Sequence, residues 1–186
     1  MTDEIAAEAP RIVLELPGEG RSRETRIRRD RTGRWWNGED PITHPALARA
    51  FDAWIDRADD GRYCLKNDVN WAYVTLEGPP LFARHATVDE GSGETAVRLA
   101  LSDGREEILD VATLREGPDD ALYCDARGGA LPCRIERSAM MALADHLEEG
   151  ADGASWLVLG AARVRPARVE DPLVPARRAV VEAVAR

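Results

Sequence analysis

Apolar residues recur at three- and four-residue steps in two stretches of the chain, a spacing typical of helices that bury one face. The first stretch predicts a helix over 44–57, with Thr43 as its N-cap and Pro45 in its first turn. The second predicts a helix over 138–149. A short helix rich in Arg, Ala and Val is also expected in the tail, 169–186. Because a helix of this length is marginal alone in water, it should dock on the body or on a partner.

Between the helices, short segments with alternating apolar and polar residues, separated by turn residues, predict strands. They are expected at 11–16, 24–30, 62–66, 69–76, 81–88, 95–102, 105–111, 121–127, 155–159 and 162–168. The pair Asp103-Gly104 stands between two alternating runs, which is a signal for a two-residue hairpin. Two helices among many strands with turn-like connections predict an α+β fold.

A weak internal repeat indicates how the chain is organised. Shifting residues 42–73 by 93 positions aligns a helix stripe, an acidic turn and the strand that follows, although few residues are identical. This favours duplication, with two similar halves that each combine a helix with an antiparallel sheet. The expected organisation is a disordered N-terminus at 1–10, an N-terminal half at 11–93, a C-terminal half at 94–168 and the tail helix at 169–186.

Composition and charge narrow the classes of partner. The chain of 186 residues carries 34 acidic and 25 basic side chains, a net charge of −9, which disfavours nucleic acid and acidic membrane surfaces as partners. No apolar run approaches the length that a membrane helix needs, and the acidic start lacks the layout of a signal peptide. A cytoplasmic location is therefore expected. The three cysteines match no zinc spacing and are expected to be reduced structural thiols.

Simple catalytic constellations are not evident in the sequence. There is no nucleophile elbow, no Walker loop and no dinucleotide fingerprint. The histidines His44, His85 and His146 stand apart from one another and from the cysteines, so no metal site and no cofactor are expected. The sequence leans against an enzyme, while an active site assembled from scattered residues around His85 or His44 stays open.

Seven arginines fall between Arg21 and Arg34, and Trp35-Trp36 follows directly. Arginine forks beside aromatic rings can hold phosphates and stack on bases. The same residues also suit an exposed edge strand that is guarded by charge. Both interpretations of this cluster stay open at this point.

Several short motifs resemble, in their order along the chain, a bacterial family known as domain of unknown function 1285 (DUF1285). They are Gly33-Arg34-Trp35, Pro41-Ile42, Gly61-Arg62-Tyr63, Glu77 with Pro80-Leu81, Tyr123, Arg127-Gly128-Gly129 and Arg137. The resemblance implies a duplicated α+β core whose second half is a pleckstrin-homology-like barrel. It also implies a pocket between the halves for a nucleotide-like molecule, a role in signalling and no known catalytic activity. The chain departs from the family pattern at Asn70, Gly78 and Leu101-Ser102, so its ligand can differ.

These observations lead to a hypothesis and an alternative. The hypothesis is a cytoplasmic ligand-binding or regulatory module that holds a nucleotide-like or other anionic small molecule between its halves. The alternative is a protein-interaction subunit that acts through the C-terminal helix or a sheet edge, with a protein partner or by self-association. Polar and amphipathic side chains at element ends and along the repeated strand are the candidate pocket residues. They are Trp35, His44, Tyr63, Lys66, Asn70, Trp71, Arg127 and Arg137.

Overall fold

The computed structural model describes residues 22–91, 95–151, 153–174 and 179–183, and these form an α+β fold that consists mostly of sheet. The chain divides into two compact units, unit 1 (Met1–Glu77) and unit 2 (Gly78–Arg186). The sequence analysis had drawn the division after residue 93. The predicted disorder at 1–10 and the predicted strand at 11–16 lie outside the described residues. None of the sheets formed by the described strands closes on itself, so the expected barrel is not seen.

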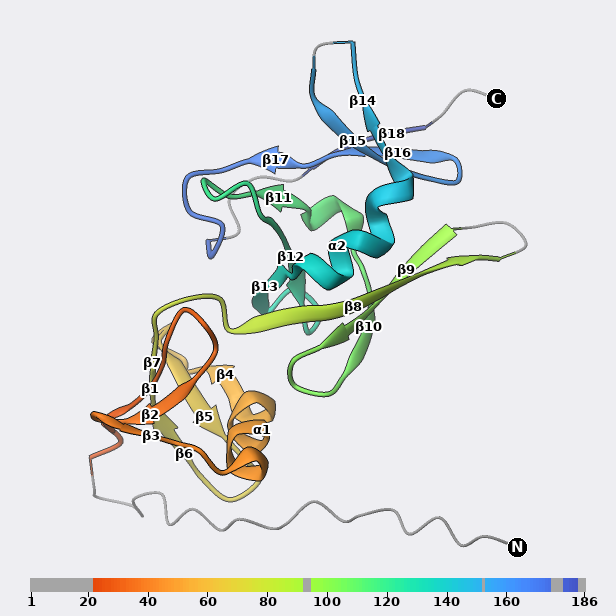
Figure 1. Ribbon diagram of the computed structural model, residues 1–186. Helices are drawn as coiled ribbons and strands as arrows, with labels where there is room; N and C mark the ends of the chain where they lie inside the picture. The colour runs from red at the N-terminus through yellow and green to blue at the C-terminus, as the bar shows by residue number, and fades with distance from the viewer. Residues whose placement is uncertain (1–21, 92–94, 152, 175–178, 184–186) are drawn as a thin grey trace, which may run out of the picture. The chain divides into compact units, whose positions relative to one another are not determined.

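From residue 22 onward, unit 1 forms one helix and two small sheets, drawn in orange and yellow in Figure 1. Its elements are β1 (Ile27–Arg29), β2 (Trp35–Asn37), β3 (Asp40–Pro41), α1 (Pro45–Trp54), β4 (Ile55–Arg57), β5 (Tyr63–Lys66), β6 (Trp71–Tyr73) and β7 (Thr75–Leu76). One sheet has the order β3-β2-β1-β7, in which β7 runs parallel to β1, and the other has the order β4-β5-β6.

Helix α1 begins and ends differently from the prediction. His44, not Thr43, is the N-cap, and its Nδ1 accepts a hydrogen bond from the backbone N–H of Leu47 at 3.4 Å. The helix ends at Trp54 because the next three residues pair as β4 with β5. Pairing with a neighbouring strand therefore outweighs the helical periodicity that extends through β4. The apolar face of the helix is buried through Phe51.

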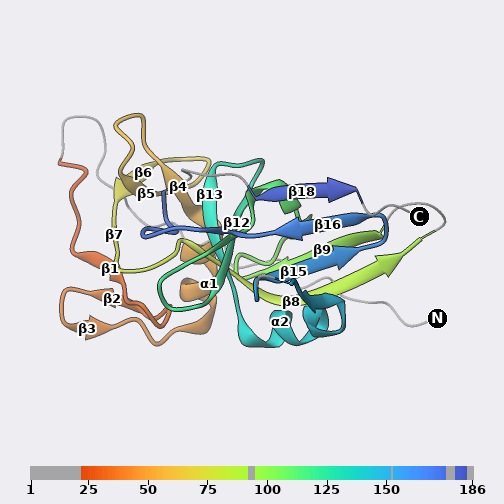
Figure 2. The same cartoon turned by 90° about the horizontal axis from the view of Figure 1, so that it is seen from above.

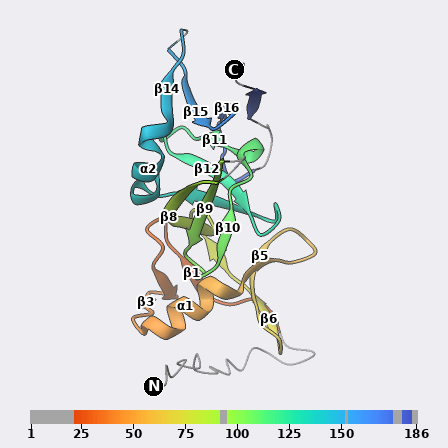
Figure 3. The same ribbon diagram turned by 90° about the vertical axis from the view of Figure 1, so that its right-hand side faces the viewer.

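The described residues of unit 2 form one helix, two single turns of 3₁₀ helix and two sheets. Its elements are β8 (Leu81–Glu90), β9 (Thr95–Leu101), β10 (Glu106–Ile108), η1 (Val111–Thr113), β11 (Arg115–Glu116), β12 (Leu122–Ala126), β13 (Leu131–Ile135), α2 (Arg137–Leu143), η2 (Ala144–His146), β14 (Leu147–Glu149), β15 (Ser155–Leu159), β16 (Ala162–Arg165), β17 (Ala167–Arg168) and β18 (Val180–Ala183). The seven-stranded sheet has the order β10-β9-β8-β13-β12-β11-β17, and β8, β9 and β10 can be followed in Figure 3. The second sheet has the order β14-β15-β16-β18, and its last three strands lie side by side in Figure 2.

Strand β13 was not among the predicted strands, and a proline such as Pro132 is unusual in the middle of a sheet. In the structure β13 lies between β8 and β12, yet it pairs with β8 only over Cys133–Ile135. Pro132 lies outside that ladder, so its missing N–H interrupts no hydrogen bond to β8.

The helix predicted over 138–149 and the tail helix are also corrected. Helix α2 ends at Leu143, and after a 3₁₀ turn the chain continues as β14, which pairs with β15. In the tail, the described residues Val180–Ala183 form a strand that pairs with β16. Two adjacent valines favour a strand, and a short isolated helix gains too little to compete with a sheet edge.

The same order of elements and pairings occurs in both units. The series β1-β2-β3-α1-β4-β5-β6-β7 corresponds to β11-β12-β13-α2-β14-β15-β16-β17, and in each series the first strand runs parallel to the last. Ile55 pairs with Leu65 in unit 1, and Leu147 pairs with Leu157 in unit 2. These positions are 92 residues apart, so the register differs by one from the 93-residue shift that the sequence suggested.

Candidate functional site

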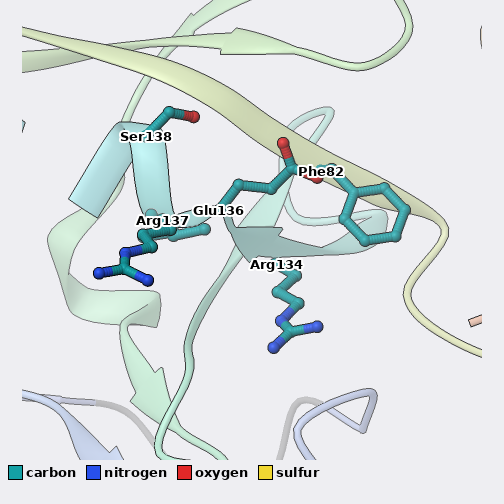
Figure 4. A pocket seen from close by; sticks show the side chains of 6 residues that line it. Phe82, Arg134, Glu136, Arg137 and Ser138 are labelled. Atoms are coloured by element: carbon teal, nitrogen blue, oxygen red, sulfur yellow. The ribbon is translucent and has the colours of Figure 1, made fainter. Parts of the chain in front are cut away.

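A small pocket of about 370 Å³ opens on unit 2 where β13 leads into α2. Its lining consists of one ring, one buried aliphatic side chain and four polar side chains: Phe82, Ile135, Arg134, Glu136, Arg137 and Ser138. Figure 4 shows the guanidinium groups of Arg134 and Arg137 pointing to the same side, away from the Phe82 ring and the Glu136 carboxylate. We call this the small pocket.

The two arginines of the small pocket differ in their partners. Arg134 pairs with Asp119 at 3.0 Å, and both side chains are partly exposed. The side chain of Arg137 is exposed and forms no hydrogen bond or ion pair with any residue in the described part of the chain. A pair at this level of exposure contributes about 0–1 kcal/mol, so an incoming anion can replace Asp119 on Arg134.

Two hydroxyl groups hold the framework around the small pocket. The Ser138 hydroxyl donates a hydrogen bond to the carbonyl of Arg84, which ties the start of α2 to β8. The Ser102 hydroxyl accepts a hydrogen bond from the Phe82 N–H at 3.1 Å. The side chains that line the pocket therefore stand on elements that are fixed to one another.

A larger pocket of about 670 Å³, also within unit 2, lies between the β14–β18 sheet and the β11–β17 end of the seven-stranded sheet. Its apolar lining comes from Leu122, Met140, Leu147, Leu157, Pro166, Ala167 and Val180. Its charged lining comes from Glu116, Asp120, Arg165 and Arg168. Arg168 pairs with Glu116 at 3.5 Å and with Asp120 at 3.0 Å.

The turn between β11 and β12 supplies an acid to each pocket. Asp119 pairs with Arg134 of the small pocket, and Asp120 pairs with Arg168 of the larger one. Asp120 has a φ of 55°, a left-handed conformation that costs free energy for a residue with a side chain. Burial and the nearby Asp119 carboxylate raise the pKa of Tyr123, so this phenol stays protonated and donates to Asp119.

Two of the predicted pocket residues have structural roles in unit 1. Trp35 is buried, and its Nε1–H donates to the Asp52 carboxylate at 2.8 Å. The same carboxylate pairs with the buried Arg29 at 3.2 Å. His44 is exposed and caps α1.

The other four predicted residues of unit 1 lie on the β5–β6 hairpin. Asn70 accepts a hydrogen bond from Arg23 at 3.1 Å, and the Arg23 guanidinium stacks on the Trp71 ring at 4.1 Å. Lys66 pairs with Trp71 across the hairpin, which brings three predicted residues together. At the start of β5, the Tyr63 hydroxyl accepts a hydrogen bond from Arg57, the last residue of β4.

Arg127 lies in unit 2 but does not line either pocket. Its guanidinium pairs with Asp103 at 2.6 Å, and the two side chains are 12% and 0% exposed. Its backbone N–H also donates to the Glu107 carboxylate. The left-handed φ of 52° at Arg127 belongs to the tight turn between β12 and β13. Arg127 thus holds this turn against the β9–β10 turn.

Arg137 is the predicted residue that lines a pocket, and sequence reasoning missed its neighbours Phe82, Arg134, Glu136 and Ser138. Arg134 was missed because β13 was not predicted. A strand residue three positions before Arg137 would otherwise have been a second candidate cation.

The described part of the chain also carries carboxylates, histidines and cysteines, the side chains that bind metal ions. Within the described ranges no group of three or more His, Cys, Asp or Glu residues could hold a metal ion. Cys64, Cys124 and Cys133 are free and buried. A hydrogen bond with Cys124, together with burial, raises the pKa of Cys133, and burial raises that of Cys64, so both stay thiols. No helix in the described part of the chain is long and apolar enough to cross a membrane.

Comparison with known proteins identifies the fold. No model of a known protein family matches the chain, and no curated protein matches it. A DUF1285 family protein from Silicibacter pomeroyi DSS-3 is 23% identical with a TM-score of 0.58, and the match covers 72% of this chain and 75% of that one. A DUF1285 family protein from Shewanella baltica OS155 is 17% identical with a TM-score of 0.50, covering 67% of this chain and 94% of that one. These likenesses confirm the resemblance to DUF1285 proteins at the level of the fold.

Proposed function

Starting from the fold of DUF1285 family proteins, we propose that this chain is a ligand-binding or regulatory module whose unit 2 holds a small anionic molecule in the small pocket. The observation that carries the proposal is the pair of guanidinium groups on the same side of one pocket. One of them, on Arg137, has no partner among the described residues, and the other is held by a partly exposed acid.

The chemistry of the pocket suits a phosphate or carboxylate group. Guanidinium forks bind these groups through two parallel hydrogen bonds, and such charge-assisted bonds are about twice as strong as neutral ones. The Phe82 ring on the pocket wall offers an apolar surface for the remainder of the ligand. A nucleotide-like or other phosphorylated molecule, with its phosphate on the arginines, matches this chemistry.

A thermal-shift screen against inorganic phosphate, pyrophosphate and nucleoside monophosphates tests the proposal. A ligand at about a hundred times its Kd should stabilise the chain by about 2.7 kcal/mol. Arg137→Gln should abolish the shift because it removes the guanidinium that has no competing partner. Arg98→Gln is the matched control, since this arginine forms an exposed pair with Asp89 outside the pocket.

Asp119→Asn sharpens the test because it releases Arg134 from its ion pair. The variant should bind phosphate more tightly than the unmodified chain, whereas a purely structural ion pair would leave phosphate affinity unchanged. If no phosphorylated compound gives a shift that depends on Arg137, the proposal fails.

We also propose that the two units arose by duplication. The shared order and pairing of eight elements, at a constant 92-residue offset from α1 to β7, supports this origin. The turn glycines Gly61 and Gly153 both have positive φ values, 84° and 75°, at positions with this offset. In an alignment of relatives, the sequence of residues 45–76 should resemble that of residues 137–168 more than that of any other segment of the same length.

Self-association through β18 is a second candidate function. This strand is the last in its sheet among the described strands, and its Val180 and Val181 are 51% and 49% exposed. An uncovered apolar edge is a template for pairing with another chain. Val181→Lys should convert a dimer to a monomer in light scattering, and a monomeric unmodified chain would exclude this function.

A further inference from the structure

The two units use the same framework positions in different ways. The β1–β2 turn closes with backbone hydrogen bonds from Asp30 to Arg34 and from Gly33 to Asp30. The β11–β12 turn closes with the same pattern, from Gly117 to Ala121 and from Asp120 to Gly117. The residue that follows each turn is therefore equivalent, which places Leu122 of unit 2 at the position of Trp35 in unit 1.

Three equivalent positions show the difference in packing. In unit 1, Trp35, Ile55 and Leu65 are 2%, 0% and 1% exposed and belong to the core. Their counterparts in unit 2 are Leu122, Leu147 and Leu157, which are 9%, 39% and 1% exposed. All three counterparts line the larger pocket. The larger pocket thus occupies the region that unit 1 fills with its own core.

In unit 1, the Trp35 indole fills much of the region that corresponds to the larger pocket. It packs edge-on against Phe51, with ring centroids 5.1 Å apart, and donates to the buried Asp52 carboxylate. In unit 2 the equivalent positions are Leu122, Leu143 and Ala144, so a ring, a second ring and a carboxylate are replaced by smaller apolar groups. The resulting hollow is open to solvent at Leu147 and Val180, and its apolar walls offer a surface that an apolar ligand group can cover.

We propose that the larger pocket of unit 2 is a second binding site, for a flat aromatic molecule that carries one anionic group. The ring of the ligand takes the place that the Trp35 indole holds in unit 1, against Leu122, Met140 and Leu157. The volume of about 670 Å³ is within the range of ligand pockets, roughly 300–1,000 Å³.

The charged side chains at the larger pocket account for the anionic group of the proposed ligand. Arg165 on β16 and Arg168 on β17, consecutive strands of different sheets, line the pocket, and Arg168 is already bound by Glu116 and by the exposed Asp120. That aspartate is 76% exposed and sits in a left-handed turn conformation. A carboxylate on the ligand can displace it at little cost, because the ion pair is exposed.

The test uses naphthoate, with naphthol as the uncharged probe and naphthylmethylamine as the cationic probe. In thermal-shift titrations at millimolar concentration, naphthoate should raise the Tm most, naphthol less and the amine least. At about a hundred times Kd, naphthoate should raise the Tm by about 5–10 °C. A Tm that none of the three probes changes overturns the proposal.

Leu122→Trp places in unit 2 the side chain that unit 1 has at this position. It should remove the naphthoate shift while the Tm of the free protein stays equal or rises, because the indole fills the pocket. Asp120→Asn should instead tighten naphthoate binding, because it removes the nearer of the two carboxylates that pair with Arg168. A naphthoate shift that persists unchanged in a folded Leu122→Trp variant overturns the site.

Amide chemical shifts of the unmodified chain provide the readout that needs no variant. Naphthoate should perturb the amides of Leu122, Leu157 and Ala167, and perturbation confined to other residues overturns the site. The result is independent of the small pocket, since Arg137→Gln should leave naphthoate binding unchanged and Leu122→Trp should leave phosphate binding unchanged.

Discussion

Unit 1 and unit 2 share one framework of paired strands and differ in what fills it. Unit 1 packs Trp35 against Phe51 and satisfies the indole N–H with a buried aspartate. Unit 2 places leucines at the equivalent positions, Leu122 and Leu143, and leaves a pocket beside the first. The comparison teaches that strand pairing determines the architecture here, whereas side-chain volume determines whether the interior is a core or a cavity.

The hairpins of the two units also differ in which strand carries the arginines that stack on aromatic rings. In unit 1, β6 supplies the rings Trp71 and Tyr73, and arginines from outside that strand stack on them at 4.1 and 3.3 Å. In unit 2, β16 supplies Arg163 and Arg165, and both stack on Trp156 of β15, the first at 4.5 Å. The stacking is retained while the strand that carries the cation changes.

Breaking the buried charge of unit 1 should have the largest effect. Arg29→Met leaves the Asp52 carboxylate buried without its cation, and the loss of one partner of a buried pair costs about 3–5 kcal/mol. Arg28→Met, which removes an exposed pair with Glu77, should cost less than about 1 kcal/mol. Urea unfolding followed by tryptophan fluorescence reports mainly on unit 1, which contains Trp35, Trp36, Trp54 and Trp71. Equal costs for the two variants would contradict the role of Arg29.

Making the two cores alike should have the next largest effect. Trp35→Leu gives unit 1 the residue that unit 2 has at this position, and it should destabilise unit 1 by about 2–4 kcal/mol through a cavity and a lost hydrogen bond to Asp52. Leu122→Trp in unit 2 should cost nothing or stabilise. The same urea experiment measures both, and a large loss in Leu122→Trp would mean that the larger pocket does not have room for the indole.

Arg127→Ala should destabilise unit 2 by about 2–3 kcal/mol, because the carboxylate of Asp103 is fully buried and loses its nearest cation. Arg105 stands 3.7 Å from the same carboxylate and limits the loss. This expectation differs from an anion-binding role for Arg127, which would leave stability unchanged. Far-ultraviolet circular dichroism during urea unfolding measures the change, with Arg98→Ala as the exposed control.

The smallest effect should be the acid dependence that Asp30 gives to unit 1. Burial raises the pKa of this carboxyl, but hydrogen bonds from Thr32, Trp36 and Arg34 outweigh it and lower the pKa to about 2. A group with a lowered folded pKa contributes stability above its unfolded pKa of about 3.9 and loses that contribution as the pH falls toward 2. Asp30→Asn should therefore flatten the fall in unit 1 stability between about pH 4 and pH 2. An unchanged acid profile in urea unfolding would contradict this role.

More of the fold than of the candidate site could be predicted from the sequence. Helix periodicity located both helices, and turn residues located most hairpins, because both are local signals. The segments 55–57 and 147–149 were predicted as helix because their periodicity continues that of α1 and α2, yet they pair as strands. Their partners, β5 and β15, are placed by the turns that follow, and a local pattern cannot report that contact.

The amino-acid sequence alone was enough to predict the α+β class and the likeness of fold to DUF1285 proteins, because both depend on composition and on the local order of residues. Which arginines are available to a ligand depends on contacts that form when the chain folds. Arg29 and Arg127 are taken up by buried carboxylates, whereas Arg137 is exposed beside a pocket. Side-chain partners are chosen by contacts between distant segments, so identical residue types in one chain become a core ion pair in one place and a candidate ligand site in another.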